Sequence, residues 1–89
     1  MKASAHKPPS DEQLIRLGEQ ARQLGCDPMF DEALGQIIND QYKIISQSAP
    51  ENIAQRESCY QLIRAIDHIR TQINTIQDRG DRVKARGAK

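Results

Sequence analysis

The sequence has very few aromatic residues. Its 89 residues include no tryptophan, and the aromatic side chains are Phe30, Tyr42 and Tyr60. A chain of this length buries only about 60% of the surface that it exposes when unfolded. The core must therefore be built from isoleucine and leucine and will be thin. Small proteins with thin cores usually gain stability from disulfides, a metal ion or oligomerisation.

Cysteine and histidine are almost as scarce. Cys26 and Cys59 form no CxxC pattern, and no histidine stands at ligand spacing beside them. We interpret both as small apolar helix residues in a reducing compartment, with a disulfide as the alternative. His6 lies in a polar leader and His68 on an expected helix, and neither has a ligand set nearby. We therefore expect neither a metal site nor a cofactor.

Long apolar runs are also missing. No run approaches the roughly 18–20 residues needed to cross a bilayer. The leader, residues 1–10, has no apolar segment of the kind found in secretory signals. We therefore expect an intracellular protein that makes no membrane contact.

The motifs of common enzyme classes are absent as well. The sequence contains no GxSxG, no HExxH, no glycine-rich phosphate loop and no cysteine with a plausible histidine partner. Asp67 and His68 are adjacent, but neighbours on a helix project about 100° apart and do not form a dyad. We expect a protein that is not an enzyme.

Charge, by contrast, is plentiful and unevenly distributed. Residues 1–10 carry +2, residues 11–78 carry eleven acids against six bases (−5), and residues 79–89 carry five bases against one acid (+4). The basic side chains of the last segment are Arg79, Arg82, Lys84, Arg86 and Lys89. Such a tail binds phosphates or an acidic protein groove, or it is a solvated tail that keeps the protein in solution. No aromatic residue interrupts the tail, so base stacking is not indicated.

Two helices are expected before the middle of the chain. The first spans about residues 11–24, because Ser10 and Gln13 form a capping box and Gly25 is a natural left-handed terminator. The second spans residues 28–47, because Asp27-Pro28 supplies an N-cap and a proline in the first turn.

The third expected helix is the longest, over residues 49–79. A second capping box, Ser48 to Glu51, begins it, and Gly80 ends it. Its apolar residues step by three and four in a heptad pattern typical of packed or coiled helices. We expect this pattern to be a seam for partners, formed by Cys59, Leu62, Ile66, Ile69, Ile73 and Ile76.

These elements predict an all-α fold. A short turn at 46–49 makes the two long helices an antiparallel hairpin, preceded by the short helix. The third helix overruns the second, so Ile69 to Ile76 needs cover from the first helix or from another subunit. We favour oligomerisation over a monomeric three-helix unit. The expected organisation is an extended leader (1–9), one helical domain (10–80) and a basic tail (81–89), with both tails flexible or ordered by partners.

The chain from residue 27 to 80 resembles small proteins encoded among the head and packaging genes of tailed bacteriophages. The resemblance lies in Asp27-Pro28-x-Phe30-x-x-Ala33-Leu34, an apolar helix through Tyr42, Ser48-x-Pro50, and Arg56-Glu57-x-x-Tyr60-x-Leu62-x-x-Ala65. It implies a virion or assembly component, present in the host cytoplasm when made and then in the virion. It implies no catalytic residues.

Three functions are therefore considered. The first is a structural or assembly component of a phage-like particle, which binds copies of itself and other subunits through the apolar seam and tails. The second is an accessory protein that binds nucleic acid through the basic tail. The third is a small regulator or inhibitor that docks on a host protein through its acidic body.

Overall fold

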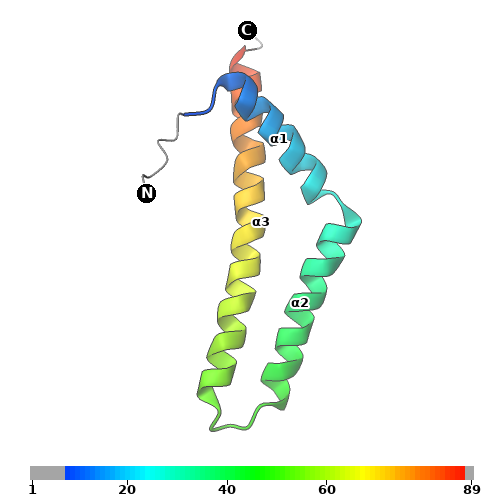
Figure 1. Ribbon diagram of the computed structural model, residues 1–89, viewed down its shortest axis with the longest axis vertical. Coiled ribbons are helices and arrows are strands. Elements are labelled where there is room, and N and C mark those ends of the chain that lie inside the picture. Colours follow the sequence, from blue (N-terminus) through cyan, green and yellow to red (C-terminus); the bar gives the residue numbers. More distant parts are fainter. Residues whose placement is uncertain (1–7, 88–89) are drawn as a thin grey trace, which may run out of the picture.

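The computed structural model describes residues 8–87, which fold into three α-helices. They are α1 (Asp11–Gly25), α2 (Pro28–Gln47) and α3 (Ile53–Gly87), and no strand occurs in this part of the chain (Figure 1). The fold is all-helical, as the apolar spacing predicts. The leader predicted at residues 1–9 lies mostly outside the described residues.

Local capping sets the ends of α1 and the start of α2. The Gln13 backbone N–H donates to Ser10 Oγ (3.2 Å), and the Ser10 backbone N–H donates to Gln13 Oε1 (2.8 Å), which completes the predicted capping box. Asp27 caps α2 by accepting from the Met29 N–H (2.8 Å). The prediction of a left-handed glycine at the end of α1 is wrong: no residue within 8–87 has a positive φ. The chain turns instead through Cys26 (φ −98°, ψ 1°) directly into the cap of α2.

The connection between α2 and α3 differs from the prediction. Ser48 does not begin α3; its Oγ donates back to the Ile45 carbonyl (2.8 Å), and it is the C-cap of α2. Asn52 takes the starting role, because its Oδ1 accepts from the Gln55 N–H (3.3 Å). The predicted start of the third helix at residue 49 is therefore wrong by four residues.

One arginine holds this connection together. The Arg56 guanidinium donates to Ser48 Oγ (3.1 Å), the Ala49 carbonyl (2.8 Å) and the Pro50 carbonyl (2.7 Å). A planar guanidinium can serve several acceptors at once, which a lysine ammonium on its flexible stem does less well. Arg56 thus adds three side-chain hydrogen bonds to a connection in which the Ala49 carbonyl also accepts from the Asn52 backbone N–H (2.9 Å).

Gly80 does not end α3, and the prediction that it does is wrong. The helix runs through it to Gly87, so residues 81–87 are helical. Gly80 is buried where α1 crosses α3: a Cβ on Gly80 would lie 2.7 Å from the Leu14 carbonyl oxygen and 3.0 Å from Gly18 Cα. Glycine is present here because two helix backbones approach closely.

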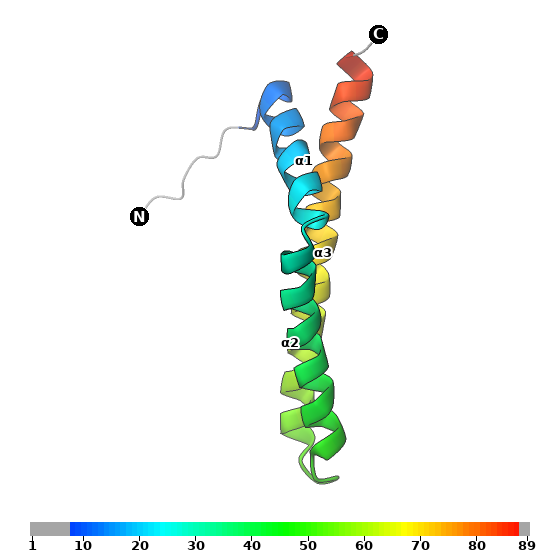
Figure 2. The same cartoon turned by 90° about the vertical axis from the view of Figure 1, so that its right-hand side faces the viewer.

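The other two helices both pack against the long helix α3. Helix α2 runs antiparallel to its N-terminal half, and α1 packs against its C-terminal half, while α1 and α2 barely touch each other (Figure 1). Viewed from the side, α2 lies over α3, whereas α1 begins to one side of it (Figure 2).

The molecule is long and its core is thin. It measures 58 × 38 × 18 Å with a radius of gyration of 18.2 Å, against about 12 Å for a compact domain of this length. The buried hydrophobic residues are Ala21, Leu34, Cys59, Ile63, Ile66 and Val83. No large side chain within the described residues is fully buried. The three helices therefore cover one another only in part.

Candidate interaction surfaces

Ion pairs fasten α1 to the end of α3. They are Arg22–Asp81 (2.7 Å), Lys84–Glu19 (2.8 Å) and Arg86–Asp11 (3.7 Å), measured from nitrogen to oxygen. All of these side chains remain substantially exposed. Each pair alone is therefore a weak contact in water, and their common effect is to set the position of α1 on α3.

Glu19 is the centre of this network. The hydrogen bond and the positive charge of Lys84 lower the pKa of the Glu19 carboxyl, and Arg22 lowers it further. The sequence reasoning missed Glu19, because its partner Lys84 is 65 residues away along the chain.

The predicted polyanion contacts are divided by this arrangement. Lys84 and Arg86 are paired with acids of α1. Arg79 and Arg82 are exposed, and no ion pair within residues 8–87 involves them. Lys89 lies outside the described residues. The charges predicted for a free tail thus belong, as far as residue 87, to a helix that packs on α1 through buried Val83.

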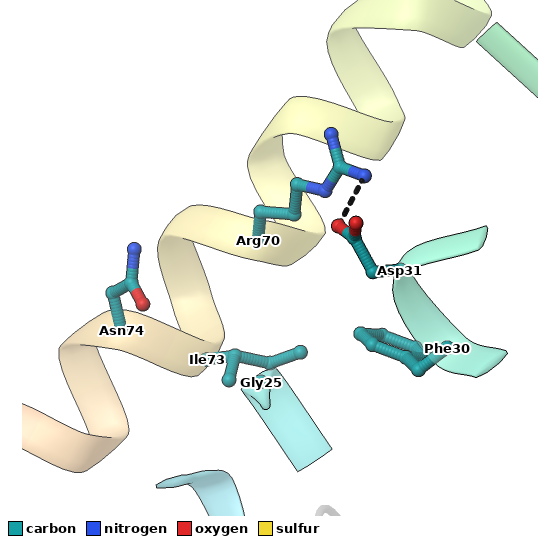
Figure 3. A pocket seen from close by; sticks show the side chains of 6 residues that line it. All are labelled: Gly25, Phe30, Asp31, Arg70, Ile73 and Asn74. Carbon is teal, nitrogen blue, oxygen red and sulfur yellow. Dashed lines mark hydrogen bonds and ion pairs between the residues drawn. The ribbon is translucent and has the colours of Figure 1, made fainter. Parts of the chain in front are cut away.

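A small notch lies where the start of α2 meets the middle of α3. Its lining is Gly25, Phe30, Asp31, Arg70, Ile73 and Asn74 (Figure 3). Arg70 donates to Asp31 (3.1 Å) across the opening, while Phe30 and Ile73 point toward each other below this pair. Both charges are already partnered, so the notch is best explained as the joint that docks α2 on α3.

The predicted partner seam is divided between two environments. Cys59 and Ile66 are buried within the chain, and Ile73 and Ile76 are half-buried. Leu62 (40% exposed) and Ile69 (42%) face solvent. The heptad pattern is therefore shared between contacts inside the chain and an open apolar surface.

The structure adds exposed apolar residues that are not part of the predicted seam. On α2 these are Ile37 (37% exposed) and Ile44 (36%). The breadth of the apolar stripe on α2 was the available signal, because one neighbouring helix covers only part of such a stripe. Leu34 at its centre is buried, and Ile38 and Ile45 are half-buried.

Within residues 8–87, no three histidine, cysteine, aspartate or glutamate side chains gather where they could hold a metal ion. No helix in this part of the chain is both long enough and apolar enough to cross a membrane.

The resemblance to phage proteins stays a prediction. No family model, curated protein or solved structure matches the chain.

Proposed function

We propose that the protein is a non-enzymatic structural or assembly subunit that acts by packing its apolar helix faces against other protein subunits. The observation that carries this proposal is the exposure of its large apolar side chains. Among residues 8–87, ten of them are at least 36% exposed, whereas six hydrophobic residues form the core. Single exposed apolar residues are normal on a protein surface, whereas apolar residues that gather on one face mark a binding site.

The shape supports the same role. Helix α3 has 35 residues and reaches about 52 Å, yet each half of it is covered on one side by a single short neighbour. An elongated helical unit with open faces is suited to repeated side-by-side packing. The hydrophobic effect would drive such packing, since it scales with the apolar area removed from water.

The setting of a phage-like particle rests on the sequence resemblance over residues 27–80 alone. The tail-based alternative, binding of nucleic acid, is less well supported because Lys84 and Arg86 are engaged with α1. The third alternative, docking on a host protein, would use the acidic body of residues 11–78 rather than the open apolar surface.

Two measurements test the proposal. Sedimentation equilibrium of the full chain should give a mass above 10.1 kDa at micromolar concentrations. Mass spectrometry of purified particles, against a host-lysate control, should find the chain enriched in the particles. A chain that is monomeric at every concentration and absent from particles would refute the proposal, and salt-sensitive DNA binding would favour the tail-based alternative.

A further inference from the structure

Helices α1 and α2 pack on different sides of α3. The residues of α3 buried at the level of α2 are Cys59, Ile63 and Ile66, and those buried at the level of α1 are Gly80 and Val83. At about 100° of rotation per residue, the directions of these two groups differ by roughly 100°. Helix α1 therefore lies to one side of the plane that contains α2 and α3, as Figure 2 shows.

The exposed seam residues of α3 point to that same side. Leu62 and Ile69 lie about 70–90° around the helix from the direction that faces α2, and Ile76, half-buried near α1, continues their line. They extend the side of α3 that α1 covers into the stretch that α1 does not reach. The apolar side chains there have no neighbour within residues 8–87 to cover them fully.

On α2, Ile37 and Ile44 are displaced in the same rotational sense. They lie about 60–80° around the helix from buried Leu34, which faces α3. Two antiparallel helices are related by a twofold axis perpendicular to the plane that contains both. Rotation about this axis leaves each side of the plane unchanged. Residues displaced in the same rotational sense on α2 and α3 therefore lie on the same side of that plane. Ile37, Ile44, Leu62 and Ile69 thus form one apolar surface, which we call the uncovered face.

Charge separates this face from the opposite one. Apart from Asp40, the other residues that the helix geometry places on it are uncharged, and all are exposed: Met29, Ala33, Gln47, Ala54, Gln55, Ser58, Ala65 and Gln72. Asp40, at its outer edge, is the one charged residue of α2 or of the stretch 53–77 of α3 that falls on it. The charged side chains of this stretch of α3 lie inward or on the opposite side: Arg56, Glu57, Arg64, Asp67 and Arg70. Loss of charge is the compositional mark of the centre of a protein interface.

We infer that the uncovered face binds the same face of a second copy of the chain, with the two copies antiparallel. This inference rests on the proposed function and names its partner. An apolar face with its one charge, Asp40, at the outer edge suits its own copy, and twofold dimers are the commonest homo-oligomers. The face is about 30 Å long and two helices wide, roughly 600 Å² in projection. The accessible area of the face is larger than this projected area, which brings it toward the roughly 800 Å² that each partner contributes to a standard interface.

The position of α1 decides the orientation. Helix α1 rises from the side that carries the uncovered face, at the C-terminal end of α3. In a parallel dimer the two α1 helices would meet in the same space. In the antiparallel dimer each α1 lies beyond the α2–α3 connection of its partner, so the two α1 helices are kept apart at opposite ends of a four-helix arrangement.

Two matched substitutions test the face. Leu62 and Tyr60 are equally exposed on α3 (40% and 41%), but they lie about 160° apart around the helix. Leu62→Glu should weaken self-association at least tenfold in sedimentation equilibrium, because it places two charges in an apolar interface. Tyr60→Glu should leave the mass distribution unchanged. Circular dichroism should show the same helix content for both variants and the parent chain.

A spin-label distance tests the orientation. Cys26 is exposed and Cys59 is buried, so a label on a Cys59→Ser chain reaches Cys26 alone. Cys26 lies near the level of Ile73, because a Cβ on the neighbouring Gly25 would lie 3.7 Å from the Ile73 side chain. If the twofold axis passes near Leu62, two labels in the antiparallel dimer are roughly 30 Å or more apart. A separation below about 20 Å would overturn the antiparallel arrangement.

The outcomes separate this inference from the proposed function. If the parent chain self-associates and both glutamate variants behave alike, the uncovered face is not the interface, although the subunit role stands. If the parent chain stays monomeric but is enriched in particles, the face binds another protein and the dimer is excluded. Loss of association in Leu62→Glu alone, with the long label distance, supports the inference.

Discussion

Gly80 lies at the closest approach between two helix backbones. An added Cβ would have to displace the Leu14 carbonyl or Gly18, both of which are backbone of α1. Backbone cannot move aside as a flexible side chain can. Gly35, also within a helix, has no atom within 4 Å of the position that a Cβ would take. A methyl group should therefore fit at Gly35 but not at Gly80.

We expect Gly80→Ala to lower the free energy of unfolding by about 1–3 kcal/mol, because α1 must shift away from α3. Gly35→Ala is the control and should raise it by about 0.4–1 kcal/mol through the unfolded chain. Urea unfolding followed by circular dichroism, at one protein concentration, measures both. Equal effects of the two substitutions would contradict the close crossing.

At the scale of elements, α1 is held on α3 by buried small residues and by exposed ion pairs. The pairs of Glu19 and Asp81 connect residues on opposite ends of the chain. Helix α2 is held on α3 by the Arg70–Asp31 pair at one end and by the Arg56 contacts at the other. Charged contacts thus fix where α1 and α2 lie on α3, and the few apolar contacts between the helices form at these positions.

The docking of α1 should weaken in acid. The pKa of Glu19 is lowered in the folded protein, chiefly by Lys84, so its ionised form favours folding. That contribution is complete above the ordinary glutamate pKa of about 4.3 and is lost as the pH falls through the lower folded value. Thermal unfolding at pH 7 and pH 3 should therefore show a smaller acid-induced fall for Glu19→Gln than for the parent chain. An identical fall in both proteins would show that Glu19 does not contribute.

The α2–α3 connection should depend on Arg56. Arg56→Ala removes three donated hydrogen bonds and should lower the free energy of unfolding by roughly 1 kcal/mol, since the acceptors can turn to water. Arg64→Ala is the control, because Arg64 is an exposed arginine of the same helix outside every ion pair of the described residues. Urea titration of both variants measures the difference, and a cost of the same size in Arg64→Ala would argue against the clamp.

At the scale of the whole molecule, stability and association should be linked. The chain buries few residues and exposes many apolar ones, so a second copy would complete the core that one copy lacks. A partner that binds only the folded state raises the unfolding temperature as its concentration rises. The unfolding midpoint of the parent chain should therefore rise with protein concentration, while that of Leu62→Glu should not. A midpoint independent of concentration in the parent chain would mean that the single chain is the stable unit.

Local chemistry determined the number of helices and most of their ends, and these could be predicted. The Ser10 capping box and the Asp27 cap act on backbone groups within three residues, so the sequence contains all the information that they need. The start of α3 was predicted wrongly because Ser48 and Asn52 both offer caps, and the choice depends on how Ser48 contacts Ile45 and Arg56.

The tertiary structure alone decided what lies on each side of α3. Whether Gly80 ends a helix or lets another helix approach depends on where α1 crosses, which no local pattern records. The same holds for the seam: Ile66 and Ile69 both belong to the heptad seam, yet one is 5% exposed and the other 42%. Periodicity identifies the apolar side of a helix, but only the positions of α1 and α2 determine which part of that side remains open to a partner.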